Sequence, residues 1–115
     1  MGDRSYPGAI LERPIRRGWS MPRVPGARTS EAVVRRARLS AAGTTLAAWL
    51  ALEHGIACSA AGGSHHAGPG HGAGFCVFND VAVAARVLLA EGAVDRILVV
   101  DLDVHQGDGT AAIFR

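Results

Sequence analysis

Residues 96–110 read RILVVDLDVHQGDGT, an aliphatic run that ends in three acids and a histidine. An unbroken aliphatic run is typical of a parallel β-strand that is covered on both faces. Side chains of an extended strand alternate between two faces, so Asp101, Asp103 and His105 project to the same side. Carboxylate and imidazole aimed at one point suit a zinc ion, at about 2.0–2.2 Å. Asp101, one step deeper, is placed to orient a histidine.

The same letters also fit a simpler structure. HQGDGT can be a plain turn in which Asp108 caps the helix that follows. The residues of this stretch leave both interpretations open.

A second polar cluster lies upstream, in the glycine-rich loop SHHAGPGHGAGFCVF at 64–78. It follows IACSAAGG, residues 56–63, which is short, apolar and predicted to be a second buried strand. Ligands of parallel sheets gather at the carboxyl ends of the strands, so His65 and His66 are expected to meet the acids at 101–108. Adjacent histidines in a loop can equally be an exposed or structural pair. Beside a metal, they and the spare acids supply a general base, a general acid and orienting partners.

The rest of the chain predicts helices around these two strands. SEAVVRRARLSAAGTTLAAWLALEHG is expected to be helical from Ser30 to a stop at Gly55, although Gly43 weakens its middle. A second helix is expected from Asn79 or Asp80 to Gly92, and a third from near Thr110. The predicted buried face of the first helix consists of Val33, Ala37, Leu46, Leu50 and Trp49. This alternation predicts an α/β domain with a parallel sheet.

Composition narrows the possible functions. The chain has 115 residues, enough for one small domain. Nine of its 12 basic residues, all arginines, lie within residues 1–38. We therefore divide it into an irregular basic arm, 1–29, and a domain at 30–115. The arginines of the arm are scattered without interleaved aromatic residues, so we expect a solvated arm and no direct nucleic-acid binding.

Several other classes are disfavoured by absent motifs. The sequence has no apolar window of the roughly 18 residues that a membrane span needs, and its first residues lack a signal-peptide core. It has no GK[ST] phosphate loop, and GPGHGAGF does not follow the dinucleotide spacing GxGxxG. Cys58 and Cys76 form no metal-binding or redox spacing, so a reduced cytoplasmic protein is expected. The lysine-free, Ala/Gly/Arg-rich composition suggests a bacterial source.

Taken together, AGGSHHAGPGHGAGFCVFNDVAVAARVLLAEG and RILVVDLDVHQGDGTAAIF resemble the zinc-dependent histone deacetylase family, in its bacterial and class IV-like branch. The resemblance covers residues 40–115 well and 1–39 loosely. The motifs GG-x-HH, GFC-x-x-ND and D-x-D-x-H-x-G-D-G, in this order, are highly specific. The resemblance implies a three-layer, parallel-sheet arginase/deacetylase-like fold, of which this chain holds an incomplete N-terminal portion.

The resemblance also implies roles for individual residues. Asp103 and His105 match two of the three zinc ligands. His66 matches the general base that activates water and then protonates the leaving amine, and His65 matches its electrostatic partner. Asp101 and Asp108 match the acids that hydrogen-bond His65 and His66, respectively. Gly74 and Phe75 match the wall of the channel that takes the acyl-lysine side chain. Asp101, Asp103 and His105 also match the region where the family binds a structural potassium ion.

The implied activity is hydrolysis of the acetyl amide of an acetylated protein or small acetylated amine. The family's third zinc ligand, an aspartate, and its oxyanion-stabilising tyrosine lie further downstream than Arg115, and Tyr6 is the only tyrosine here. We therefore also consider an inactive fragment or interaction module, and expect the isolated chain to be poorly soluble and inactive. An arginase-like dimanganese site is disfavoured because position 107 is Gly where that site wants an aspartate.

Overall fold

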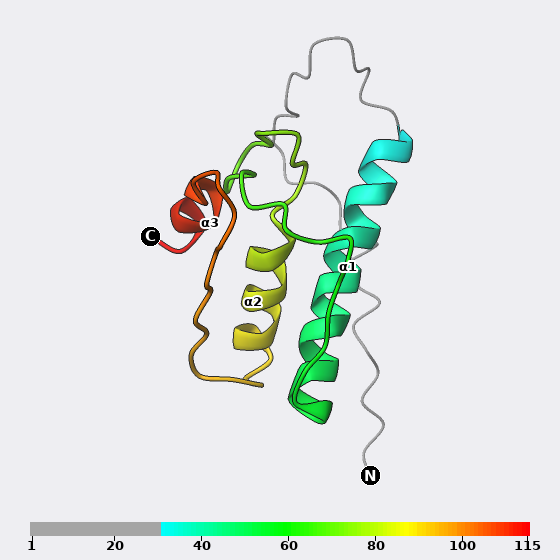
Figure 1. The fold of residues 1–115 in the computed structure, drawn as a ribbon, viewed down its shortest axis with the longest axis vertical. Helices are drawn as coiled ribbons and strands as arrows, with labels where there is room; N and C mark the ends of the chain where they lie inside the picture. Colours follow the sequence, from blue (N-terminus) through cyan, green and yellow to red (C-terminus); the bar gives the residue numbers. More distant parts are fainter. Residues whose placement is uncertain (1–30) are drawn as a thin grey trace.

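The computed structural model of the chain describes residues 31–115, which contain three helices. They are α1 (Glu31–His54), α2 (Asp80–Ala90) and α3 (Asp108–Ile113). Figure 1 shows α1 and α2 side by side, with α3 across the end of α2 where the glycine-rich loop also lies. The predicted arm, 1–29, lies outside the described residues.

Helix α1 confirms the first predicted helix. It runs without a break through Gly43, where the only neighbour that a Cβ would meet within 4 Å is the Ser59 hydroxyl, at 3.9 Å. The predicted buried stripe is wrong in part, since Val33 and Leu46 are both exposed. Small side chains face α2 instead, with Ala41 and Thr45 buried, which lets the two helices approach closely.

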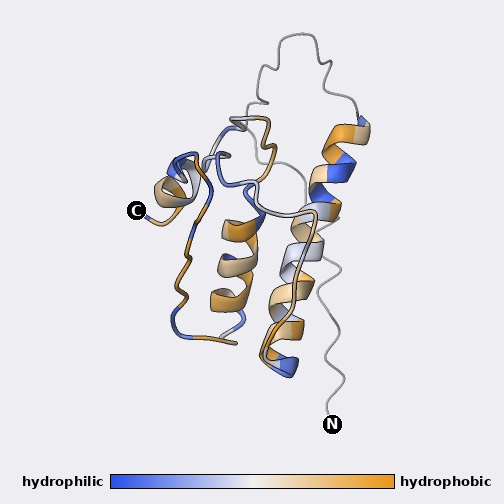
Figure 2. Ribbon diagram, in the orientation of Figure 1, coloured by the Kyte–Doolittle hydropathy of each residue, from blue (hydrophilic) through white to orange (hydrophobic). Residues whose placement is uncertain are grey.

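Helix α2 begins as the sequence predicts. The Asn79 side chain caps it by accepting a hydrogen bond from the backbone N–H of Ala82, at 3.0 Å. Gly92, with φ of 64°, follows the end of the helix in the left-handed conformation that glycine adopts readily. The helix supplies much of the apolar core, which consists of Ala41, Ala67, Val77, Ala82, Ala84, Ala85 and Leu88. Its apolar character is plain in Figure 2.

The two predicted strands are not formed within residues 31–115. Segments 56–63 and 96–103 both run outside the helices, but neither makes a strand ladder in this part of the chain. A strand requires hydrogen bonds to a neighbouring extended segment. The described residues offer one isolated bridge, between Ala73 and Cys76 in the glycine-rich loop. The helix order of the α/β prediction is therefore confirmed, whereas its sheet is not seen.

Segment 97–104 leaves a row of aliphatic side chains exposed. Alternate residues are the most exposed: Leu98 at 86%, Val100 at 69%, Leu102 at 91% and Val104 at 92%. The alternation is that of an extended segment, which presents its other side to the glycine-rich loop. This second side is the one that carries Asp101 and Asp103.

None of the helices within residues 31–115 combines the length and the apolar character that crossing a membrane requires.

Candidate active site

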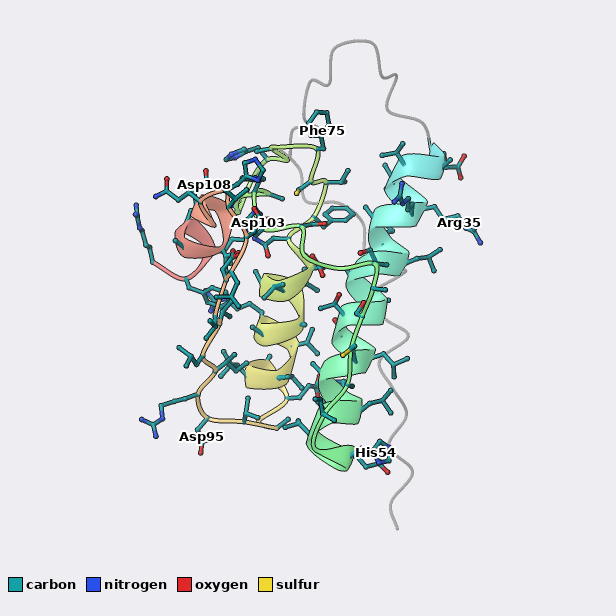
Figure 3. The ribbon with its side chains drawn as sticks, viewed as in Figure 1. Arg35, His54, Phe75, Asp95, Asp103 and Asp108 are labelled. Carbon is teal, nitrogen blue, oxygen red and sulfur yellow. The ribbon has the colours of Figure 1, made fainter. Side chains whose placement is uncertain are left out.

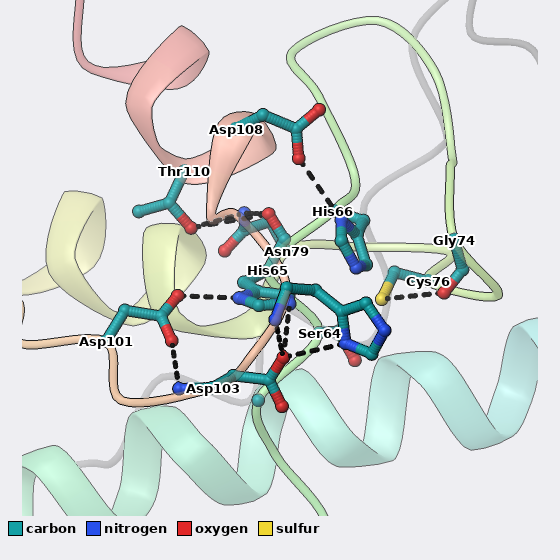
Figure 4. Close-up of polar contacts among 12 residues, drawn as sticks. Ser64, His65, His66, Gly74, Cys76, Asn79, Asp101, Asp103, Asp108 and Thr110 are labelled. Carbon is teal, nitrogen blue, oxygen red and sulfur yellow. Dashed lines mark hydrogen bonds and ion pairs between the residues drawn. The ribbon is translucent and has the colours of Figure 1, made fainter.

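Two segments that lie 36 residues apart meet at His65 and Asp101. The Nδ1 atom of His65 lies 2.6 Å from Oδ2 of Asp101 (Figure 4). A carboxylate only accepts hydrogen bonds, so this contact places the imidazole proton on Nδ1. The Nε2 atom of the same ring lies 3.7 Å from Oδ1 of Asp103. His65 is buried, and it is thereby held between two carboxylates.

His66 has a separate carboxylate partner. Its Nδ1 atom lies 3.1 Å from Oδ1 of Asp108, the first residue of α3 (Figure 4). The two adjacent imidazoles contact each other edge-on, with their centroids 4.3 Å apart. Asp108 makes no side-chain cap, since the residue at the cap position of α3 is Gly107. The simpler interpretation of Asp108 as a helix cap is therefore wrong, and its carboxylate is directed at His66 instead.

Asp103 and His105 converge as the predicted metal ligands would. Asp103 Oδ1 accepts from the backbone N–H of His105 at 2.7 Å and lies 2.9 Å from Nδ1 of the same residue. Two zinc bonds of about 2.0–2.1 Å that meet at a tetrahedral angle hold their donor atoms about 3.3 Å apart. This oxygen and nitrogen lie closer together than that, because they are hydrogen-bonded to each other. As donor types, carboxylate and imidazole suit zinc, which would have to replace that hydrogen bond. Within residues 31–115 no set of three or more His, Cys, Asp or Glu side chains is arranged to hold a metal.

The charges of the cluster shift its ionisation equilibria. The hydrogen bond that His65 donates to Asp101 raises the pKa of His65, against the opposing effect of burial and with further help from the charges of the three acids. The reciprocal bond lowers the pKa of Asp101 below 3.8. The pKa of Asp103 is lowered mainly by the backbone N–H of His105, and that of Asp108 mainly by His66. All three acids are therefore held as carboxylates at neutral pH.

The backbone of the histidine pair is fixed by Asn79, a residue that the sequence assigned only to a helix cap. Its Nδ2 group donates to the carbonyls of His65 and Ala67, at 3.1 and 3.2 Å, and to the Thr110 hydroxyl at 2.9 Å. The Thr110 N–H also donates to the His65 carbonyl, at 3.1 Å. One buried amide thus joins the start of α2, the histidines and α3.

Asp80 is the second supporting residue that the sequence did not single out. It is 1% exposed and accepts hydrogen bonds from the N–H groups of Gly63 and Ser64. Its position directly after a capping asparagine concealed this role, because an acid in the first turn of a helix is favourable for electrostatic reasons alone. A GG motif followed by a polar residue could have given the signal, since glycines permit a side chain to approach the backbone closely.

Gly74 and Phe75 form the outer edge of the site. Both have positive φ angles, 52° and 64°. A Cβ at Gly74 would overlap Cδ2 of His66, so only glycine lets the loop lie against that imidazole. Phe75 is 84% exposed and projects away from the helices at the tip of the loop (Figure 3).

The other histidines and cysteines take no part in the cluster. His54 lies at the far end of α1 (Figure 3), and His71 packs against Gly68 in the exposed part of the loop. Cys76 donates weakly to the carbonyl of Gly74, at 3.5 Å, and Cys58 is exposed. A hollow of about 360 Å³ lies beside His65, Asp101 and Asp103, next to the backbone of the predicted second strand.

The sequence is also similar to known proteins. The family model of the histone deacetylase domain matches residues 15–115. An uncharacterized protein from a Picosynechococcus strain is 59% identical over 86 residues, which are 75% of this chain and 29% of that protein. The acetoin utilization protein AcuC of Staphylococcus aureus (strain COL) is 49% identical over 53 residues, 46% of this chain and 13% of AcuC. Histone deacetylase 2 of Arabidopsis thaliana is 40% identical over 72 residues, 63% of this chain and 19% of that protein.

The chain thus spans at most about a third of the length of these relatives. No solved structure matches it. The family model nevertheless covers most of the chain, including the two adjacent histidines and all three acids that surround them. The chain belongs to the histone deacetylase family.

Proposed function

We propose that this chain supplies one part of the active site of a zinc-dependent deacetylase that hydrolyses the acetyl amide of acetyl-lysine or of a small acetylated amine. The observation that carries the proposal is the pairing of two adjacent imidazoles with two different carboxylates. His65 binds Asp101 and His66 binds Asp108, each through Nδ1. The Nε2 atom of His66 is thereby left available for another partner, whereas that of His65 faces Oδ1 of Asp103 at 3.7 Å.

The two histidines are suited to different tasks. His66, whose side chain is 24% exposed, is the general base that takes a proton from the attacking water on Nε2 and then donates it to the leaving amine. Asp108 holds its ring and stabilises the charge that forms. His65 is more buried, and Asp101 raises its pKa, so it is suited to staying protonated and acting electrostatically.

Asp103 and His105 would hold the zinc ion with one oxygen and one nitrogen. When bound, zinc lowers the pKa of water and polarises the amide carbonyl. Catalytic zinc sites use three protein ligands, so a further ligand has to come from outside residues 31–115. We also propose that backbone carbonyls around Asp101, Asp103 and His105 contribute to a structural potassium site.

The acyl-lysine side chain would enter past Gly74 and Phe75. The backbone of Gly74 lies against His66, and the exposed Phe75 ring stands at the tip of the same loop. A linear, apolar methylene chain is the part of the substrate that such a wall would contact. The cytoplasm is the location that we propose for this activity.

The dimanganese alternative is disfavoured by packing at position 107. A Cβ at Gly107 would lie 2.6 Å from Oδ2 of Asp101, the oxygen that binds His65. An aspartate there would displace the His65 partner. The non-catalytic alternative predicts the same hydrogen bonds but no metal-dependent turnover, so experiment can separate the two.

A chimera tests the proposal. The 86 matched residues of this chain would replace their counterpart in the Picosynechococcus protein, and acetate release from an acetyl-lysine peptide would be measured before and after chelation. We expect chelator-sensitive release that His66→Ala abolishes while zinc stays bound, and that Asp103→Ala abolishes together with the zinc. Full zinc occupancy in Asp103→Ala, or loss of release when the unmodified relative is active, would contradict the proposal.

A further inference from the structure

We propose that Asp80, anchored by Thr44 of α1, is a positioning residue that sets the backbone ahead of the tandem histidines and thereby aims His65 at Asp101. The proposal rests on the function proposed above for the histidine pair. It assigns a role in that site to two residues that touch neither a histidine ring nor a predicted metal ligand.

The Asp80 carboxylate is bound on both oxygens. Oδ1 accepts from the N–H of Ser64 at 2.6 Å, and Oδ2 accepts from the N–H of Gly63 at 3.0 Å. The hydroxyl of Thr44 donates to Oδ2 at 2.6 Å. A buried carboxylate is stable only when its charge is compensated. The three donors compensate the charge of Asp80, and so does the N-terminal turn of α2, in which Asp80 lies. Ion pairs to Asp80 are not formed within residues 31–115.

The backbone at Gly62 is shaped around this carboxylate. A Cβ at Gly62 would overlap Asp80 Oδ2 and come within 2.5 Å of the Thr44 hydroxyl. The absence of a side chain is therefore a condition for the contact between Asp80 and Thr44. Gly63 adds a left-handed turn, with φ of 94°, that directs the chain from the carboxylate toward the histidines.

Only one peptide bond separates these anchors from His65. The Ser64 N–H is held by Asp80, and the His65 N–H donates to the carbonyl of Gly63 at 2.9 Å in the same turn. On the other side, Asn79 holds the carbonyls of His65 and Ala67. Adjacent residues at the start of α2 thus hold the histidine segment from both ends: Asp80 binds its N–H groups and Asn79 binds its carbonyls. The 2.6 Å contact from His65 to Asp101 depends on this placement.

Thr44 and Thr45 offer a matched pair of variants. The hydroxyl of Thr44 reaches Asp80, whereas that of Thr45, buried in the same helix, donates to the carbonyl of Ala41 at 2.8 Å. Valine replaces threonine with little change of shape. Thr44→Val removes the anchor of Asp80 and Thr45→Val does not, while Thr44→Ser keeps the hydroxyl. Asp80→Asn is the stronger change, because it turns a donor toward one of the N–H groups.

The experiment is NMR spectroscopy of the full chain, without metal or substrate. Two signals are followed: the downfield Nδ1 proton of His65, which reports its hydrogen bond to Asp101, and hydrogen exchange at the Gly63 and Ser64 amides. We expect Thr44→Val to weaken or remove the first signal and to speed exchange about tenfold, as for a lost hydrogen bond to a charged group. Thr44→Ser should restore both, and Thr45→Val should leave both unchanged.

The proposal is overturned if Thr44→Val leaves the His65 signal intact, or if Thr45→Val alters both signals as much as Thr44→Val. Should Asp80→Asn fail to fold, the threonine variants still decide. These signals require no turnover. A chimera that releases no acetate, combined with a His65 signal that responds to Thr44→Val, would reject the proposed function and retain the positioning role.

Discussion

His65 and Asp101 form a short, directed contact across 36 residues of sequence, 2.6 Å from Nδ1 to Oδ2. The contact joins the glycine-rich loop to the extended segment ahead of α3, and each partner changes the pKa of the other. Stability of the metal-free chain should therefore depend on pH through this pair.

The pH dependence of this pair has a defined sign. Because the folded pKa of His65 lies above its ordinary 6.5, the stability that it contributes is fully present below pH 6.5 and is lost as pH rises through the raised value. Because the folded pKa of Asp101 lies below 3.8, its contribution is present above pH 3.8 and is lost as pH falls through the lowered value.

We therefore expect Asp101→Asn to destabilise the metal-free chain most between about pH 4 and 6.5, with a smaller difference at either side. Urea unfolding followed by circular dichroism across this range would measure it. Asp95→Asn, a change at an exposed acid at the start of the same segment (Figure 3), is the control. A difference that is constant with pH would contradict the reciprocal pKa shifts.

Removing either of the two proposed metal ligands should reduce zinc affinity steeply. We expect Asp103→Ala and His105→Ala each to weaken Zn²⁺ binding by at least about tenfold, because the loss of either donor leaves only one of the converging pair. Competition with a coloured chelator would measure the affinity. His54→Ala removes an exposed histidine at the end of α1 and should have no effect. Equal losses in all three variants would show that zinc binds elsewhere.

Gly62→Ala should destabilise the fold by about 1–3 kcal/mol, the usual effect of forcing an extra methyl group into an occupied space. The new Cβ would meet the Asp80 carboxylate and the Thr44 hydroxyl. Gly70→Ala is the matched control, because nothing lies within 4 Å of a Cβ at that position. Denaturant unfolding of both variants would compare them, and equal free energies of unfolding would refute the close approach at Gly62.

Asn79→Ala should cost about 2–3 kcal/mol, since it removes a helix cap and leaves the Ala67 carbonyl without its amide donor. Asn79→Asp separates the two effects. The aspartate keeps an oxygen to accept from the Ala82 N–H but cannot donate to the carbonyls of His65 and Ala67. If Asn79→Asp were as stable as the unchanged chain in thermal unfolding, the helix cap alone would account for the contribution of Asn79 to stability.

Local sequence signals predicted the helices well, because their ends depend on neighbouring residues. Asn79 caps α2 and Gly92 follows its end, as their residue types indicate. The buried face of α1 was predicted less well. Large aliphatic residues such as Val33 and Leu46 favour burial, but which face is covered depends on the elements that pack there. Within the described residues, α2 covers the face of Ala41 and Thr45 instead.

In the site, too, features set by neighbouring residues were predictable, whereas contacts between distant segments were not. The spacing of Asp101, Asp103 and His105 predicted side chains on one side. The structure places Asp101 and Asp103 beside His65 and brings the ring of His105 to 5.7 Å from that of His66. The roles of Asn79 and Asp80 were not predictable from spacing, since each acts on backbone atoms 12 to 17 residues away. Strand formation was not predictable either, because a ladder needs a paired neighbour as well as an aliphatic run.

The two histidine–aspartate pairs also bear on how the length of this segment can vary during evolution. Neighbouring imidazoles select different carboxylates, one from position 101 and one from position 108. Inserting or deleting one residue between Gly63 and His66 would move both imidazoles away from their carboxylate partners at once. The loop around Gly70, which contacts neither acid, can change length without this penalty. Homologues should therefore differ in length there while keeping the spacing of the two histidines fixed.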